Sequence, residues 1–150
     1  MPVYPIRYAS FPIEPSPAFP DGRIAHRPLL RVALVHENRF LDCYSLVDSG
    51  ADFCSFPLSF AQALGFDMAS GVMDISSGMG SEYVPTRYWP VGLDLQGIAR
   101  FEVYAGFTTG LEAWGIGLLG QSGFFDRFKI SFDHASGLYY IEAPGTAISG

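Results

Sequence analysis

Short apolar runs separated by turn residues dominate the sequence from residue 29 onward. Leu30, Val32 and Leu34 alternate with their neighbours, and the tripeptide Glu37-Asn38-Arg39 separates them from a second run at 40–47. A period of two is typical of half-buried strands, and a short polar break between two such runs predicts a hairpin. Seventeen glycines provide for many tight turns. The chain is therefore predicted to form an all-β domain.

The remaining runs predict further strands and two short helices. Strands are expected at 72–75, 82–88, 91–95, 99–107, 115–119, 129–133 and 138–142. Helices are expected at 58–64 and 122–128, where Pro57 suits the first turn of the former and Gly65 suits its C-terminal cap. Because these elements do not alternate between β and α, the order does not indicate a doubly wound parallel sheet.

The length of 150 residues favours a single domain. Seven of the eleven prolines lie within the first 28 residues, where they restrict φ and remove backbone donors. We expect an N-terminal arm or extension over 1–28, the main domain over 29–143 and a tail over 144–150. Three interpretations of the arm stay open: a flexible leader, a strand-like arm that packs on a partner subunit, or a cleavable extension.

Composition excludes several classes of partner. The formal net charge of -6 has the wrong sign for binding nucleic acid or an anionic membrane surface. The longest charge-free stretch is too short for a membrane span, which needs about 18 apolar residues. The N-terminus lacks the pattern of a secretory signal, so a cytoplasmic location is expected. Only 16% of the residues are charged, which indicates apolar surface reserved for an interface or a groove.

Metal and cofactor sites are not indicated. Cys43 and Cys54 lack the spacing of a zinc site, and the three histidines are scattered along the chain. The segment 115–120 has the glycine pattern of a dinucleotide-binding turn. That pattern requires a full helix after it and further parallel strands, for which little chain remains. We therefore expect no metal and no organic cofactor.

An acidic turn follows the apolar run at 40–47. The sequence Asp48-Ser49-Gly50-Ala51 would form an ordinary turn in many proteins, because Asp and Ser bond to nearby backbone and Gly permits positive φ. A carboxylate at the end of a buried strand is nevertheless costly unless it is hydrogen-bonded or functional. Asp48 is therefore a candidate catalytic residue.

A second motif appears some seventy residues later, where Leu118 and Leu119 precede Gly120. A glycine directly after a bulky apolar strand indicates close approach of another backbone segment. Together with the Asp48 turn, this motif resembles the two-part signature of the retropepsin-like aspartic proteases, over roughly 29–143. The resemblance implies a closed, pepsin-like all-β barrel of one lobe with one or two short helices, active as a symmetric homodimer.

The resemblance also implies roles for individual residues. Asp48 would be catalytic, Ser49 would fix the loop across the dimer, and Gly50 would allow close backbone approach. Substrate would contact Ala51, Asp52 and a hairpin flap with its tip at Gly78, Met79 and Gly80. Structural support of the active-site loop would come from Leu118, Leu119 and Gly120. Many retroviral members carry Arg where this chain has Gln121, which leaves Asp52 without that guanidinium partner.

The implied chemistry needs two aspartates that share one proton. Of the nine aspartates, only Asp48 is followed by Ser-Gly or Thr-Gly. A protease of this kind would therefore place Asp48 of each subunit at a two-fold axis and hydrolyse peptide or protein substrates. Two other interpretations stay open: a non-catalytic peptide- or protein-binding β-barrel that keeps the fold, and an enzyme that removes its own Pro-rich arm.

Overall fold

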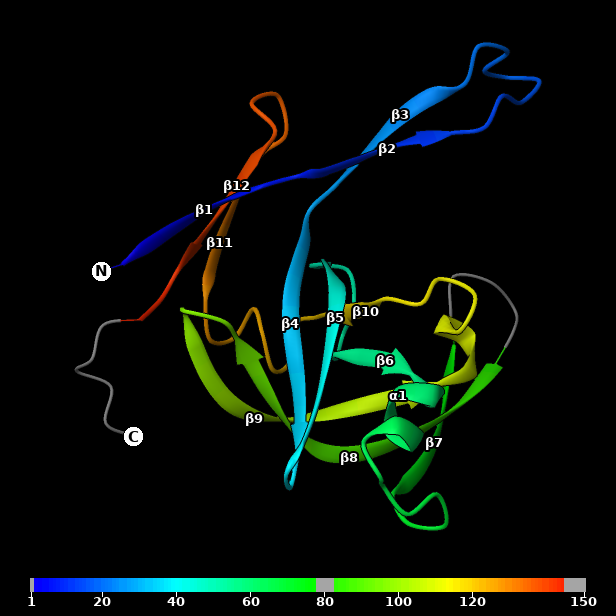
Figure 1. Cartoon of the computed structure of the whole chain (residues 1–150), viewed down its shortest axis with the longest axis vertical. Coiled ribbons are helices and arrows are strands. Elements are labelled where there is room, and N and C mark those ends of the chain that lie inside the picture. Colours follow the sequence, from blue (N-terminus) through cyan, green and yellow to red (C-terminus); the bar gives the residue numbers. More distant parts are fainter. Residues whose placement is uncertain (1, 78–82, 145–150) are drawn as a thin grey trace. The chain divides into compact units, whose positions relative to one another are not determined.

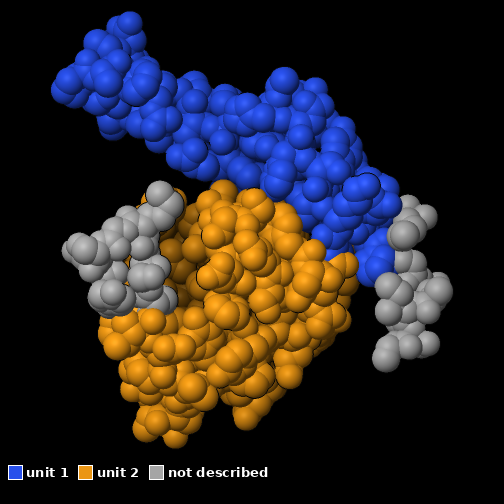
Figure 2. Space-filling model, turned by 180° about the vertical axis from the view of Figure 1, so that it is seen from behind, with its two compact units in different colours: residues 1–29, 128–150 blue, residues 30–127 orange. Residues whose placement is uncertain are grey.

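The computed structural model describes residues 2–77 and 83–144 and divides the chain into two compact units. One unit comprises Met1–Leu29 with Phe128–Gly150, and the other comprises Leu30–Arg127 (Figure 2). The strands that follow Phe128 thus belong to the same compact unit as the N-terminal strands.

The larger unit is built from a seven-stranded sheet that closes on itself (Figure 1). Its strands in spatial order are β4 (Leu29–His36), β5 (Arg39–Val47), β10 (Gly117–Leu119), β6 (Ser55–Pro57), β9 (Ala99–Thr108), β8 (Tyr83–Leu95) and β7 (Val72–Ser77). An additional pairing between β4 and β8 closes six of these strands into a barrel and leaves β7 outside it. The predicted all-β class and closed barrel are confirmed.

Side chains of alternate residues fill the inside of this barrel. Val32 and Leu34 on β4 and Leu93 on β8 are fully buried. Ala33 and Val35 on β4 are also buried, so burial on this strand alternates less strictly than the sequence pattern. The rings of Phe56 and Phe107 pack beside each other with centroids 5.7 Å apart. The predicted hairpin between the first two barrel strands is confirmed, with its turn at 37–38.

The predicted strands at 82–88 and 91–95 are wrong as separate elements, because β8 runs without a break through Pro90. On one edge β8 pairs continuously with β9, including Pro90 opposite Tyr104. On its other edge it pairs with β7 as far as Tyr88 and with β4 from Gly92. On this second edge, Pro90 lies in the gap between the residues paired with β7 and those paired with β4. Its missing N–H therefore removes no ladder hydrogen bond on that edge.

The helix predicted at 58–64 is confirmed as α1 (Leu58–Ala63), which ends before Gly65 with its φ of 80°. The helix predicted at 122–128 is wrong. The segment forms turns, with the amide of Phe125 donating to the carbonyl of Gly120 and that of Arg127 to Phe124. Gly123 has a φ of 107°, which no α-helix contains. The structure also contains a short 3-10 helix that was not predicted, η1 (Thr109–Leu111), between β9 and β10.

The smaller unit contains the terminal strands. In its three-stranded antiparallel sheet, β12 (Leu138–Glu142) lies between β1 (Val3–Arg7) and β11 (Lys129–Asp133). A separate antiparallel pair consists of β2 (Ala9–Ile13) and β3 (Arg23–Arg27). The Pro-rich arm is thus largely extended strand in the structure.

Within the described ranges, no helix combines the length and the apolar character needed to cross a lipid bilayer.

Candidate functional site

Asp48 lies immediately after β5, at the point where β5 runs parallel to β10. Val47 pairs with Leu119 in this parallel ladder, and both side chains are buried. The backbone amide of Asp48 donates to the carbonyl oxygen of Leu119, with N and O 3.0 Å apart. The start of the acidic turn is therefore held on a rigid pair of core strands.

The turn itself orients the Asp48 carboxylate. The amide of Gly50 donates to Oδ1 of Asp48 at 2.9 Å, and the amide of Ala51 donates to the Asp48 carbonyl at 3.2 Å. A hydrogen bond from a backbone N–H to a carboxylate is charge-assisted and stabilises the ionised group. Asp48 is half-buried, whereas Ser49 and Gly50 are exposed.

Strand β10 also contacts the segment that follows the turn. Leu118 pairs with Ser55 in an antiparallel bridge, and the amides of Gln121 and Ser122 donate to the carbonyls of Ala51 and Asp52 at 2.8 and 2.9 Å. The chain at 117–122 thus passes between the two sides of the acidic loop and binds both. This crossing holds the loop in place through backbone hydrogen bonds on both sides.

Gly120 occupies the tightest point of the crossing. A Cβ atom built there would lie 2.6 Å from the carbonyl oxygen of Ala51 and would also overlap that of Phe53. Because both obstacles are backbone atoms, neither can move aside without shifting the loop. Only glycine fits at this position, in agreement with the close approach expected from the sequence.

The side chain of Gln121 adds a further contact. Its Nε2 donates to the backbone carbonyl of Ser49 with a separation of 2.8 Å. In the sequence, Gln121 stands out only as a departure from Arg, and no contact was predicted for it. In the structure it binds the exposed half of the turn, two residues from where β10 ends.

A cavity of about 470 Å³ opens beside the acidic turn. It is lined by Asp48, Gly50, Ala51, Asp52, Phe53, Ser55, Val84, Thr86, Tyr88, Thr108, Gly110, Leu111 and Leu118. Most of its wall is apolar or aromatic, and its two acidic lining residues, Asp48 and Asp52, both come from the acidic turn and the residue after it. A concave, largely apolar cavity with a few convergent polar groups is typical of a ligand site.

Aromatic side chains form part of the cavity wall. The ring of Tyr88 packs edge-on against Phe53, with centroids 5.8 Å apart, and stacks on Tyr104 at 5.4 Å. Burial, followed by the nearby charge of Asp74 and contributions from Tyr104 and Asp52, raises the pKa of the Tyr88 phenol. Tyr88 therefore remains a neutral hydroxyl at physiological pH.

The structure brings five of the predicted site residues to the cavity: Asp48, Gly50, Ala51, Asp52 and Leu118. Leu119 is buried and Gly120 lies at the crossing, while Ser49 is exposed on the same turn. The predicted flap tip, Gly78, Met79 and Gly80, lies outside the described residues. The strands on either side of it, β7 and β8, pair with each other up to Ser77 opposite Tyr83.

Most residues of the cavity wall were not predicted from the sequence. Val84, Thr86 and Tyr88 line the cavity from alternate positions of β8. Their period of two was a usable signal, because residues i, i+2 and i+4 share one face of a strand. Thr108, Gly110 and Leu111 come from the end of β9 and from η1, and no local pattern marked them.

Other predicted features have simpler structural roles. Burial raises the pKa of the Cys43 and Cys54 thiols to about 11 each. The glycine pattern at 115–120 coincides with β10 and is followed by turns rather than a helix. Among residues 2–77 and 83–144, no three His, Cys, Asp or Glu side chains are arranged to hold a metal ion.

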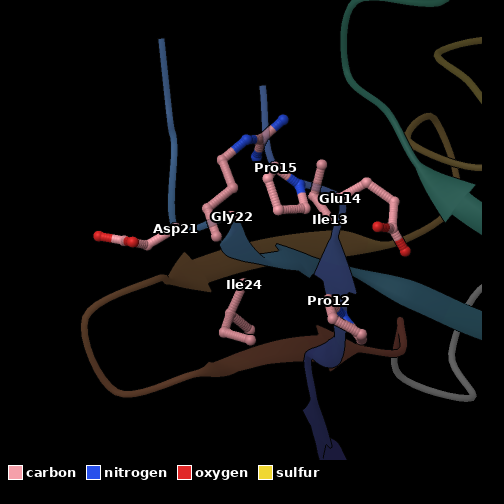
Figure 3. A pocket seen from close by; sticks show the side chains of 8 residues that line it. Pro12, Ile13, Glu14, Pro15, Asp21, Gly22 and Ile24 are labelled. Atoms are coloured by element: carbon pink, nitrogen blue, oxygen red, sulfur yellow. The ribbon is translucent and has the colours of Figure 1, made fainter. Parts of the chain in front are cut away.

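A second cavity, of about 430 Å³, lies at the loop end of the β2–β3 hairpin (Figure 3). Pro12, Ile13, Pro15, Gly22 and Ile24 are among its lining residues. The carboxylates of Glu14 and Asp21 point away from each other rather than into a common space (Figure 3). This cavity therefore lacks the convergent polar groups found beside Asp48.

No protein-family model matches the sequence, and no curated protein sequence matches it either. Among solved structures, the crystal structure of a retropepsin-like aspartic protease from Rickettsia conorii is similar, with a TM-score of 0.57 and 18% sequence identity. The match covers 88% of this chain and 98% of that chain. At this identity the similarity shows the fold, so we conclude that the chain has the closed all-β barrel fold of a retropepsin-like aspartic protease.

Proposed function

We propose that this protein is an aspartic endopeptidase in which Asp48 of two subunits activates one water molecule. The observation that carries the proposal is the position of Asp48: its carboxylate accepts from Gly50, its backbone is held by Leu119, and it lines a largely apolar cavity. The fold similarity to a retropepsin-like aspartic protease supports the same reaction class.

The chemistry requires a second carboxylate of the same kind. Two carboxylates about 3 Å apart share one proton, because both cannot be ionised at that distance. The chain has a single Asp-Ser-Gly sequence, so a second copy of the chain supplies the partner. The active species is then a symmetric homodimer with the two Asp48 side chains at its two-fold axis.

In this mechanism the ionised Asp48 acts as general base and takes a proton from the water that attacks the scissile carbonyl. The protonated Asp48 of the other subunit donates a hydrogen bond to the forming oxyanion and then supplies the proton for the leaving amine. Ser49 would hold the two loops together across the dimer. No metal or organic cofactor enters the reaction.

The cavity wall supports a substrate with a bulky apolar side chain. Phe53, Tyr88 and Leu111 offer apolar surface for a bulky apolar side chain of an extended peptide. Ala51 and Asp52 would contact the peptide beside the turn. The segment 78–80 would cover the bound peptide as a flap and exclude water.

Cleavage of an unstructured protein between about pH 4 and pH 7 tests the proposal. We expect the wild type to cleave it and Asp48→Asn to be inactive. Asp42→Asn is the matched control, because it makes the same chemical change at an exposed position of β5, where Asp42 forms a surface ion pair with Arg31 and accepts a hydrogen bond from Gln96. Equal activity of the wild type and Asp48→Asn would overturn the catalytic assignment.

Mixing of subunits tests the shared pair of aspartates. If Asp48→Asn chains exchange into wild-type dimers, a ninefold excess leaves about a tenth of the wild-type chains paired with each other. Activity per wild-type chain should then fall to about a tenth, whereas mixing with an equal excess of Asp42→Asn, which is itself active, should leave the activity per total chain unchanged. Full activity in a strictly monomeric protein would contradict the shared mechanism.

A measurement of peptide binding, made beside the cleavage assay, separates the enzyme from a non-catalytic binding barrel. If the wild type and Asp48→Asn are both inactive as dimers and bind peptides with equal affinity, the barrel is a peptide-binding module rather than a protease.

A further inference from the structure

A third cavity, of about 480 Å³, lies within the smaller unit and is unrelated to the proposed protease site. It is lined by Arg7, Tyr8, Ser10, His26, His134, Ala135, Ser136 and Gly137. Two of the three histidines of the chain therefore meet here, although they are more than a hundred residues apart in the sequence. We call this cavity the His26–His134 pocket.

Backbone hydrogen bonds bring its walls together. The amide of Tyr8 donates to the carbonyl of Gly137 at 2.9 Å, which fixes the end of β1 beside the turn between β11 and β12. In the β2–β3 ladder Ser10 pairs directly with His26, so their side chains lie on the same face. The pocket is thus built on strands and one tight turn.

The polar side chains of the pocket contact one another. Oγ of Ser10 lies 2.8 Å from Nδ1 of His26, so only one of the two ring nitrogens of His26 is engaged by Ser10. The rings of His26 and His134 meet edge to face with centroids 6.1 Å apart. Tyr8 packs edge-on against His134 at 5.3 Å.

The charges around the pocket favour an anion. Arg7 and the two imidazoles are basic, and no Asp or Glu is among the residues that line the pocket. Arg27 follows His26 on β3. The nearest acidic neighbour in sequence, Asp133, precedes His134, and its Oδ1 accepts from the amide of Ser136 at 3.2 Å.

The distribution of charge over the chain points the same way. The unit that contains the pocket has four basic residues (Arg or Lys) and four acidic residues (Asp or Glu). The larger unit, Leu30–Arg127, has five basic and eleven acidic residues. The formal charge of -6 therefore resides entirely in the larger unit. An anion near the pocket therefore meets a unit of zero formal net charge, although the negative charge of Asp133 acts on Tyr8 in the pocket wall.

We propose that the His26–His134 pocket binds a phosphate-type tetrahedral oxyanion, with an affinity that increases as the two histidines become protonated. The guanidinium of Arg7 forms paired hydrogen bonds to such an oxyanion, and the hydroxyls of Ser10 and Tyr8 donate to its remaining oxygens. Protonation gives an imidazole a positive charge and a second N–H donor, and both favour binding of an anion.

Titration of the 150-residue chain with inorganic sulfate tests the proposal, because sulfate keeps two negative charges over the whole pH range. By calorimetry at low salt, we expect one site per chain, with affinity at least about tenfold higher near pH 5.5 than near pH 8. Amide chemical shifts should change at Tyr8, Ser136 and Gly137. This measurement needs no variant. Equal affinity at the two pH values, or shift changes scattered outside the pocket, would overturn the proposal.

Variants assign the roles of the basic residues. Arg7→Gln should weaken sulfate binding at least about tenfold at both pH values, and the double variant His26→Gln with His134→Gln should abolish the pH dependence. Arg7, His26 and His134 are all exposed, so the fold should tolerate these changes. Arg23→Gln and His36→Gln are the matched controls, because neither residue lines the pocket. Normal pH-dependent binding by the double variant would contradict the role of the histidines.

The choice of anion distinguishes the sources of the ligand. Phosphate and phosphoserine should both bind near pH 5.5, and tighter binding of phosphoserine would identify a phosphate monoester as the ligand. Acetate should bind at least about tenfold more weakly than sulfate, because it offers fewer oxygens and one charge. Equal binding of acetate would overturn the preference for a tetrahedral anion.

Discussion

The side chain of Gln121 holds the backbone of Ser49, with Nε2 2.8 Å from the carbonyl oxygen. The two residues are 72 positions apart in the sequence, and their contact exists only because β10 crosses behind the acidic turn. The adjacent amide of Gln121 binds Ala51 in the same way. One residue thus binds the turn on both sides of Gly50, next to the carboxylate of Asp48.

Replacing Gln121 by Met removes the side-chain donor while nearly preserving the volume. Because Ser49 is exposed, water can donate a hydrogen bond to its carbonyl oxygen in place of Gln121. The unfolding free energy should therefore fall by no more than about 1 kcal/mol. If the bond positions Asp48, kcat/KM for peptide cleavage should fall by up to about tenfold, even though the protein stays folded. Gln62→Met, on the exposed side of α1, is the control. Unchanged kcat/KM in Gln121→Met would show that the backbone crossing alone positions the turn.

Gly120→Ala should destabilise the barrel strongly. The new Cβ would meet the carbonyl oxygens of Ala51 and Phe53, and we expect a loss of about 3 kcal/mol or more in chemical denaturation. Gly110→Ala is the matched control, because its Cβ would find only ordinary contacts, the nearest with Val84 at 3.4 Å. Similar stability of the two variants would mean that the loop at 51–53 adjusts more easily than its backbone hydrogen bonds suggest.

The two buried thiols predict a loss of stability at high pH. Burial raises the pKa of Cys43 and Cys54 from 9.0 to about 11 in the folded chain. The unfolded chain therefore releases these protons first, and stability is complete below pH 9.0 and declines as the pH rises towards 11. The decline should be on the order of 2 kcal/mol for each thiol.

Urea denaturation at a series of pH values measures this decline, and Cys43→Ala should make it smaller. Alkylation gives an independent check, because neither thiol should react near pH 8 until the protein is unfolded. Rapid alkylation of the folded protein at that pH would contradict the burial of both thiols.

The N-terminal arm should contribute to stability. Strand β1 forms a register of five residue pairs with β12, and Tyr139 on β12 donates from its hydroxyl to the carbonyl of Leu29 at 2.7 Å. A chain that lacks residues 2–27 leaves β12 paired with β11 alone. We expect it to lose about 2 kcal/mol or more, measured by denaturation of both chains.

An arm that contributes to stability should not be removed by the protein itself. Mass spectrometry after incubation of the 150-residue chain should therefore show the arm retained in the wild type and in Asp48→Asn alike. Loss of the arm in the wild type alone would identify it as a cleavable extension, removed by the protein's own activity.

Local patterns were sufficient for much of the fold. The alternation in β4, the turn at 37–38 and the helix between Pro57 and Gly65 were all predictable, because each depends on residues within a few positions of one another. Local patterns failed at 122–128 and at Pro90. In the first case, Gly123 has a φ that excludes a helix, and in the second, an edge without a partner accommodates the proline.

The sequence by itself determined the all-β class and singled out Asp48 and Gly120, because an acid after an apolar strand and a glycine after a bulky one each signal an unusual local environment. Only the tertiary structure decided what lies around them. The contact of Gln121 with Ser49, the cavity wall formed by Val84, Thr86 and Tyr88, and the meeting of His26 with His134 all join distant segments. Such contacts depend on strand order and register, and these are set by packing of the whole barrel and of the terminal sheet rather than by any short stretch of chain.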